Sequence, residues 1–203
     1  MTLRLVRLVD CPAQPWRNGG GVTRELLRWP APMPGTPPGA EDWLLRISVA
    51  EIASDGPFSA FPGVERWFAV LQGAGVRLAL PDGERLLDRT SEPVNFAGAA
   101  APMCTLLGGP TQDLNLMHRP GTTTPARALM TQMRRAPAGS VQRGRLPWRG
   151  LYVHGAACIR ADEETHELPA GSLAWSDDAQ TERWEILDLD ADADAAYWMS
   201  LQP

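Results

Sequence analysis

The sequence predicts an all-β protein with two jelly-roll or β-barrel halves, and three observations support this fold class. Apolar and polar residues alternate over short stretches, as in strands with one buried face. The 203 residues include 19 glycines and 19 prolines in recurring turn signals, which disfavour long helices. A weak repeat aligns Val70–Ala74 with Tyr152–Ala156, and each copy precedes a short hairpin and a proline-containing segment. Two related β-sheet halves would explain all three observations.

The first half contains most of the clearly alternating segments. Trp43–Ile52 is the strongest strand candidate, because apolar residues alternate with a face that carries Arg46 and Ser48. Pro81-Asp82-Gly83 predicts a hairpin turn, and the prolines of Trp29–Ala40 predict an exposed loop. The other strands expected in this half are Thr2–Val9, a strand starting at Val22, Glu65–Leu71, Val76–Leu80, Glu84–Leu87, Pro93–Phe96, Cys104–Leu107 and Thr111–Arg119.

The second half begins with Gly121–Arg145, which is rich in Arg, Ala, Pro and Gly and is interpreted mainly as a passage between the halves. The strands expected after it are Gly150–Arg160, Leu168–Trp175, Arg183–Leu189 and a closing strand from Tyr197. The predicted organisation places the functional N-terminal barrel at residues 1–120 and a reduced C-terminal half at residues 121–203. This boundary is approximate, and a single compact unit is the alternative.

Charge and composition exclude several classes of protein. All 19 basic residues are arginine, so there is no Schiff-base lysine, no phosphate-loop lysine and no Ser–Lys dyad. The formal net charge is −5 and no long basic block is present, which makes nucleic acid an unexpected partner. In the Asp188–Asp194 run, the glycine and glutamate of a calcium-binding EF-hand loop are missing. A solvated acidic turn is the better interpretation of that run.

The cysteines and the N-terminus predict a cytoplasmic protein. Cys11, Cys104 and Cys158 are odd in number and widely spaced, which favours thiols in a reducing compartment over disulfides or a zinc site. The first residues are interrupted by arginines and contain no long apolar run, so neither a secretory signal nor a membrane span is expected. The oligomeric state is left open, with a homodimer as one option.

The most distinctive stretch is Pro15–Glu25, in which three consecutive glycines lie between Trp16-Arg17-Asn18 and a strand start. Glycine permits tight bends and close approach of the backbone to another group. Such a bend beside an indole, an amide and charged side chains indicates a binding site. The alternative is an ordinary glycine loop with solvated charges, and the stretch alone does not decide between the two.

Arginines on strands provide the chemical evidence for a pocket. Arg24, Arg46, Arg66 and Arg119 are expected to face inward, and a buried guanidinium needs an acidic partner or a ligand. Glu25 and Asp113 could neutralise only some of them. The alternative is that these arginines reach out to solvent or form a structural network.

We therefore expect a positive pocket that binds a small organic acid through arginines and amides beside apolar surface. The residues expected to bind this ligand are Trp16, Asn18, Thr23, Arg24, Glu25, Arg46, Ser48, Arg66, Asp113, Asn115, Met117 and Arg119.

Several of these segments together resemble the HutD/Ves family of bacterial proteins. The resemblance is strong over residues 3–120 and rests on Pro15–Glu25, Arg46–Ala50, Gly56–Gly63, Arg66, Leu71–Gly73 and Asp113–Arg119. It implies a bicupin, with two RmlC-like jelly-roll barrels packed together. It also implies a non-catalytic, regulatory protein of histidine utilisation that binds a small carboxylate such as formylglutamate or urocanate. Ves, a stress-associated relative, has no agreed activity, and the sequence does not distinguish the two roles.

The resemblance also frames the alternatives to a binding protein. Many cupins are metal enzymes with a His-x-His motif, but the corresponding stretch Val64–Val70 has no histidine, so no metal or other cofactor is expected in the first barrel. His154 and His166 lie near several glutamates, although surface or hairpin histidines are the favoured interpretation. No Gly-x-Ser-x-Gly elbow is present, and Cys104 is interpreted as a core residue. A lyase or isomerase that uses Glu25 or Asp113 as acid or base remains the second hypothesis.

Overall fold

The computed structural model describes residues 3–31, 43–120, 129–190 and 195–203. In these ranges the chain forms strands and two short 3-10 helices, η1 (Leu8–Asp10) and η2 (Gly98–Ala100), and no α-helix. The all-β fold expected from the sequence is confirmed. Among the described residues, no helix has the length and apolar character needed to cross a membrane. The chain divides into a first unit, residues 11–125, and a second unit, residues 1–10 and 126–203.

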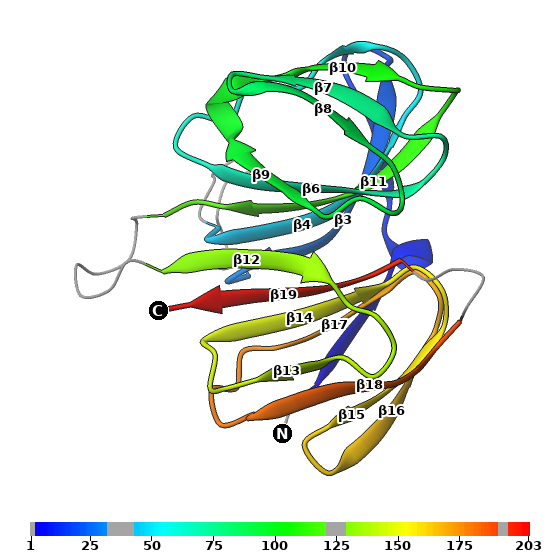
Figure 1. Cartoon of the computed structure of the whole chain (residues 1–203). Helices are drawn as coiled ribbons and strands as arrows, with labels where there is room; N and C mark the ends of the chain where they lie inside the picture. Colours follow the sequence, from blue (N-terminus) through cyan, green and yellow to red (C-terminus); the bar gives the residue numbers. More distant parts are fainter. Residues whose placement is uncertain (1–2, 32–42, 121–128, 191–194) are drawn as a thin grey trace. The chain divides into compact units, whose positions relative to one another are not determined.

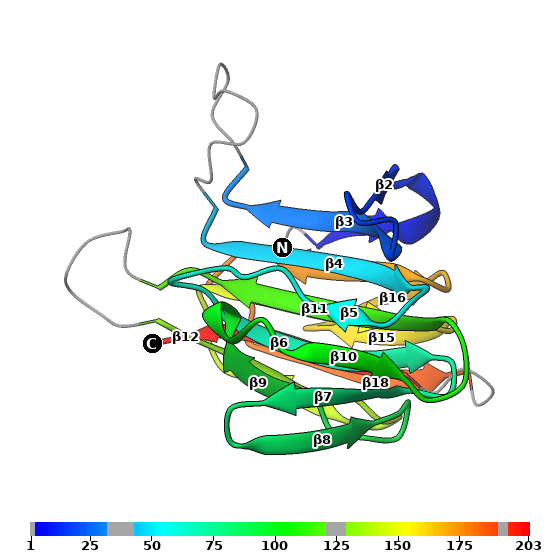
Figure 2. The same cartoon turned by 90° about the horizontal axis from the view of Figure 1, so that it is seen from above.

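The first unit contains two antiparallel sheets (Figures 1 and 2). Its larger sheet has the strand order β2-β3-β4-β11-β6-β9, and its smaller sheet has the order β5-β10-β7-β8. The strands are β2 (Ala13–Pro15), β3 (Gly21–Trp29), β4 (Leu45–Ile52), β5 (Gly56–Pro57), β6 (Glu65–Gln72), β7 (Val76–Leu80), β8 (Gly83–Leu87), β9 (Val94–Ala97), β10 (Met103–Leu106) and β11 (Thr111–His118).

The second unit repeats this plan. Its larger sheet has the order β1-β17-β14-β19-β12, and its smaller sheet has the order β13-β18-β15-β16. The strands are β1 (Arg4–Arg7), β12 (Met130–Arg135), β13 (Val141–Arg143), β14 (Trp148–Val153), β15 (Ala157–Ala161), β16 (Glu164–Leu168), β17 (Ser172–Ser176), β18 (Arg183–Leu189) and β19 (Ala196–Gln202).

Each unit buries an apolar core formed by side chains of both of its sheets. In the first unit, Phe68 and Val70 on β6 cluster with Leu78 and Cys104 of the smaller sheet. In the second unit, Leu151 and Val153 on β14 cluster with apolar residues that include Trp184 on β18. This arrangement follows from the two-residue period of a strand, because every second side chain points to the same face.

The strand pairings show that the units are internal repeats. β11 pairs with β4 and β6, as β19 pairs with β12 and β14, and the series β6–β11 therefore corresponds to β14–β19. The repeat seen in the sequence identifies the correct pair of strands but is one residue out of register. It aligns Val70 with Tyr152, whereas the core residue that corresponds to Val70 is Val153. Arg66 precedes Val70 by the same number of residues as Arg149 precedes Val153. The two arginines therefore occupy matching positions on β6 and β14.

The domain boundary at the N-terminus differs from the expected one. Residues 1–120 were expected to form one barrel, but β1 pairs with β17, and residues 1–10 therefore belong to the second unit. The alternation in Thr2–Val9 predicts a strand correctly but carries no information about its distant partner. Similarly, Gly121–Arg145 contains two strands, β12 and β13, where mainly a passage was expected. Residues 32–40 of the expected loop, residues 121–128 and residues 191–194 of the acidic run lie outside the described residues.

Candidate ligand-binding site

Three neighbouring strands of the first unit, β4, β11 and β6, form the floor of a cavity of about 520 Å³. Their register places Arg46, Met117 and Arg66 in one row across the sheet, because Met117 pairs with both arginines. Ser48 and Asn115 pair in the next row. Side chains in adjacent rows of the same face are separated by two residues along each strand. The sheet therefore brings together two guanidinium groups, an amide and a hydroxyl.

The glycine stretch forms the lip of this cavity. Trp16, Arg17 and Asn18 line the opening, and the Trp16 Nε1 donates to the Thr23 Oγ1 at 2.8 Å. A Cβ on Gly21 would lie 2.3 Å from the Glu51 carbonyl oxygen, so only glycine allows this close approach of the loop to β4. Gly21 thus allows the segment that carries Trp16 and Asn18 to lie against β4.

Aromatic side chains form the opposite wall. Phe58 is buried, and its ring lies 4.3 Å from the Arg66 Cζ and 5.6 Å from the Phe68 ring. Phe61 packs against a cluster that contains Trp43 and Met117. A guanidinium held over an aromatic face gains a cation–π attraction and loses rotational freedom. The wall therefore contacts Arg66 through an aromatic ring as well as supplying apolar surface.

Arg66 is the most deeply buried arginine of the cavity, with 7% of its surface exposed. Its Nε donates to the Asn115 Oδ1 at 2.7 Å, and the Asn115 Nδ2 donates to the Asp113 Oδ1. Burial lowers the pKa of Arg66 to about 10, which still leaves the group charged at pH 7. Its two terminal nitrogens have no hydrogen-bond acceptor among the described residues.

Asp113, which accepts the hydrogen bond from Asn115, is 1% exposed. Burial raises its pKa to about 7, although Arg66 and the hydrogen bond from Asn115 both act in the opposite direction. The carboxyl group can therefore change its protonation state near neutral pH.

Arg46 is neutralised by a different carboxylate. Its Nε lies 2.7 Å from the Glu25 Oε2, and the Arg28 NH2 lies 2.9 Å from the same oxygen. Burial alone would raise the pKa of Glu25, but Arg28 and Arg46 together hold it below its usual value. One carboxylate between two guanidinium groups leaves a net positive charge beside the cavity.

Most of the residues expected from the sequence meet at this site. Those that line the cavity are Trp16, Asn18, Thr23, Arg46, Ser48, Arg66, Asn115 and Met117. Glu25 and Asp113 do not line it but contact residues that do.

Two expected arginines lie elsewhere. Arg24 pairs with Val49 on the face opposite Ser48, and it donates a hydrogen bond to the Cys11 carbonyl oxygen. Strand alternation explains this, since Thr23 faces the cavity and its neighbour must point away. Arg119 follows the end of β11 and stacks on Trp43 with its Cζ 4.8 Å from the ring centroid. It does not line the cavity.

The sequence analysis missed several residues. The additional lining residues are Gln14, Pro15, Arg17, Ala50, Pro57, Phe58, Ser59 and Phe61. Ala50 shares the period-two face of Arg46 and could have been found from it. Phe58 and Phe61 lie in Gly56–Gly63, a segment that carries the family resemblance. Arg28 joins Glu25 only because a bulge between Glu25 and Leu27 shifts the register of β3, and no sequence signal marks that bulge.

The described residues contain no group of three or more His, Cys, Asp and Glu side chains that could hold a metal ion. His118 is buried on β11, and desolvation lowers its pKa. Cys104 lies in the core, where burial raises the pKa of its thiol to about 12. A thiol in that state is a poor nucleophile.

Comparison with known proteins agrees with this architecture. The HutD family model matches residues 9–197. The chain belongs to the HutD family. Among curated proteins, it is 40% identical over 121 residues to an uncharacterized 21.2 kDa protein in the hutC 3′ region of Pseudomonas putida, covering 58% of this chain and 59% of that protein. It is 38% identical over 109 residues to the protein Ves of Citrobacter koseri, covering 53% of each chain. These matches therefore span between about half and three-fifths of the relatives' length.

Solved structures show the same fold over the whole chain. A conserved protein of unknown function from Pseudomonas aeruginosa superposes with a TM-score of 0.80 at 25% identity and covers 100% of both chains. HutD from Pseudomonas fluorescens, solved in a formate condition, gives a TM-score of 0.76 at 24% identity and covers 99% of this chain and 98% of that one. A cupin barrel protein from Leptotrichia buccalis gives a TM-score of 0.53 at 9% identity, covering 98% and 94% of the two chains. The expected cupin fold is confirmed.

Proposed function

We propose that this protein binds a small carboxylate metabolite in the cavity of the first unit, without chemical conversion, and so moderates histidine utilisation. The observation that carries the proposal is Arg66, a buried arginine that lines the cavity and whose terminal nitrogens have no acceptor among the described residues. A planar guanidinium matches the two oxygens of a carboxylate. The Nε is already used by Asn115, so a carboxylate would bind end-on to the two terminal nitrogens.

Histidine utilisation enters the proposal through the relatives. One curated relative is encoded in the hutC 3′ region, and a protein of the same fold is named HutD. Formylglutamate and urocanate are the candidate ligands, since each has a carboxylate and a size suited to the cavity. The proposal includes a cytoplasmic location, which is supported by three cysteines that form no disulfide in the structure.

Catalysis by a lyase or isomerase mechanism is less well supported. Glu25 is held ionised between two arginines, and a carboxylate stabilised in this way is a weak general base. Asp113 has a suitable pKa but does not line the cavity, so a bound molecule would not touch it.

The test is calorimetric titration of the purified protein with formylglutamate, urocanate and glutamate. We expect at least one to bind, and Arg66→Ala to weaken that binding about 10- to 150-fold, the effect of losing a charged hydrogen bond worth about 1.5–3 kcal/mol. Arg24→Ala is the matched control, because this arginine lies on the same sheet but faces away from the cavity. Equal affinities of wild type and Arg66→Ala would place the site elsewhere, and the absence of binding to any small acid would reject the ligand class.

A further inference from the structure

Asp113 occupies the row of the sheet next to Asn115, is buried and does not line the cavity. It pairs with Ala50 on β4 and Val70 on β6, so its neighbours on both sides are apolar. Its Oδ1 accepts the hydrogen bond from Asn115, whereas its Oδ2 is buried and finds no donor among the described residues. An ionised carboxylate in such a place is costly unless a positive charge compensates it.

Arg66 supplies that compensation through Asn115. The amide accepts from the Arg66 Nε with its oxygen and donates to Asp113 with its nitrogen, so the three side chains form one continuous chain of hydrogen bonds. A carboxylate bound to the terminal nitrogens of Arg66 would add a negative charge at the other end of this chain. A single guanidinium would then face two anions in a buried environment, which favours neutralisation of one of them.

The other charged or titratable groups around Asp113 do not relieve this conflict. Arg46, on β4, is already paired with Glu25 on β3. Cys104, on β10 of the facing sheet, stays a neutral thiol near neutral pH. Asp55, before β5, is an exposed carboxylate whose Oδ1 accepts from the Leu106 backbone N–H. Arg66 is therefore the cation nearest to Asp113 in the hydrogen-bond chain, and an anion bound to its terminal nitrogens would share it with Asp113.

We propose that Asp113 takes up a proton when a carboxylate binds to Arg66, so that the protein binds its ligand as an anion together with one proton. Asp113 is a positioning residue in this scheme: it acts through Asn115 and Arg66 and does not touch the ligand. The inference rests on the proposed carboxylate binding and adds that occupancy of the site depends on pH. The ligand carboxylate itself stays ionised and exchanges no proton.

The sign of the pH dependence follows from linkage. The pKa of Asp113 in the free protein is about 7, and a neighbouring anion must raise it. Below about pH 7, Asp113 is protonated in both states and the affinity is constant and highest. Above pH 7, binding requires proton uptake, and the affinity falls by up to tenfold per pH unit until the pKa of the complex is reached.

The experiment measures formylglutamate binding calorimetrically at pH 5.5 to 9, a range in which both of its carboxylates are ionised. At each pH, titrations in two non-phosphate buffers that differ in ionisation heat count the protons taken up. At pH 8 we expect close to one proton per site, and at pH 5.5 close to none. Asp113→Asn should abolish the uptake and make the affinity independent of pH, whereas Asp55→Asn, the matched control, should retain both effects.

The outcomes separate this inference from the function on which it rests. Binding with no proton uptake and a flat affinity profile in the wild type would overturn the role of Asp113 and leave carboxylate binding intact. The absence of binding at every pH would reject the function and the coupling together. If Asp113→Asn still takes up a proton when the ligand binds, another group accepts that proton and the role proposed for Asp113 is wrong. If that variant does not fold, the proton count of the wild type still decides whether binding is coupled.

Discussion

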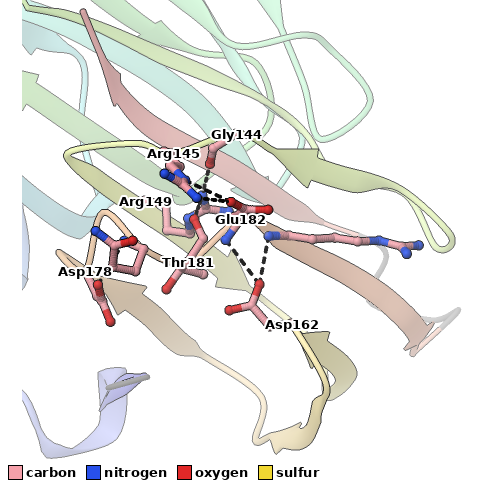
Figure 3. A network of polar contacts seen from close by, with 9 residues as sticks. Gly144, Arg145, Arg149, Asp162, Asp178, Thr181 and Glu182 are labelled. Atoms are coloured by element: carbon pink, nitrogen blue, oxygen red, sulfur yellow. Dashed lines mark hydrogen bonds and ion pairs between the residues drawn. The ribbon is translucent and has the colours of Figure 1, made fainter.

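Arg66 in the first unit and Arg149 in the second occupy matching inward positions on corresponding strands, yet their surroundings differ. Arg66 pairs across the sheet with Met117 and Phe96, borders a cavity and leaves its terminal nitrogens open. Arg149 is fully buried, and its NH2 donates to the carbonyl oxygens of Gly144 and Thr181 (Figure 3). One arginine lines a cavity, while the other is enclosed by its own chain.

The neighbouring strands account for this difference. Phe68, the next inward residue after Arg66, pairs with Asn115, but the corresponding Leu151 pairs with Trp198. An indole thus replaces the amide that links Arg66 to Asp113. A second indole, Trp184, lies with its ring centroid 5.9 Å from the Arg149 Cζ. Bulky aromatic residues fill the second barrel, so the same strand position borders a cavity in one unit and lies in a packed interior in the other.

The largest expected effect is a loss of stability in Arg149→Ala that is not accompanied by a loss of ligand binding. Arg149→Ala removes a fully buried side chain, leaves a cavity and deprives two carbonyl groups of their donor. We expect the free energy of unfolding to fall by about 3 kcal/mol, as measured by urea denaturation, while the affinity of the first unit for its ligand is retained.

Arg66→Ala is the reciprocal variant. Because this side chain borders a cavity, its loss should lower the free energy of unfolding by only about 1 kcal/mol while weakening ligand binding. The comparison would fail if Arg149→Ala impaired binding with little loss of stability, or if the two variants were equally destabilised.

The pH dependence of stability provides the next test. Asp113 has its pKa raised to about 7 by burial, above its value in the unfolded chain, so it contributes stability below about pH 4 that is lost as the pH rises to 7. Asp113→Asn should therefore gain stability relative to the wild type across this range, by about 1.4 kcal/mol per pH unit at most. Urea denaturation of both proteins at pH 4 to 7.5 measures the difference.

The corresponding change in the second unit is the control for this prediction. Asp162 is the acidic residue near Arg149, and its Oδ1 accepts hydrogen bonds from the backbone N–H groups of Glu182 and Arg183 (Figure 3). Asp162→Asn retains this oxygen and should not reproduce the pH-dependent gain. A gain of the same size would show that Asp113 is not the source.

A smaller effect is expected from the lip of the cavity. Gly21→Ala would place a methyl group 2.3 Å from the Glu51 carbonyl oxygen, which forces the loop away from β4. We expect a loss of about 1–3 kcal/mol in stability together with weaker ligand binding. Gly56→Ala is the matched control, because no atom lies within 4 Å of its added methyl. Unchanged binding in Gly21→Ala would show that the lip does not contribute to the site.

The smallest effect concerns Arg145, which lies close to Arg149 in Figure 3 but is exposed. Its NH2 lies 2.6 Å from the Glu182 Oε1, with 64% and 61% of the two side chains accessible. Such pairs contribute little, so Arg145→Ala should change the free energy of unfolding by less than about 0.5 kcal/mol. A loss comparable to that of Arg149→Ala would show that burial does not distinguish the two arginines.

The sequence by itself determined the all-β class, most strands of the first unit and the cavity face of β4 and β11. These features are local, since alternation with a period of two shows which side chains share a face. Arg46 with Ser48, and Asn115 with Met117, could therefore be placed on shared faces, and all four line the cavity. The motif segments also identified the family, because their residues and order are specific to it.

Tertiary structure alone decided which strands meet and which faces are enclosed. The pairing of β1 with β17, the bulge that brings Arg28 to Glu25, and the aromatic wall at Phe58 all depend on contacts between distant segments. The sequence also does not distinguish Arg66 from Arg149, because both are inward arginines on corresponding strands. Whether such a residue faces a cavity or a packed interior is set by side chains on neighbouring strands, and a local pattern carries no information about them.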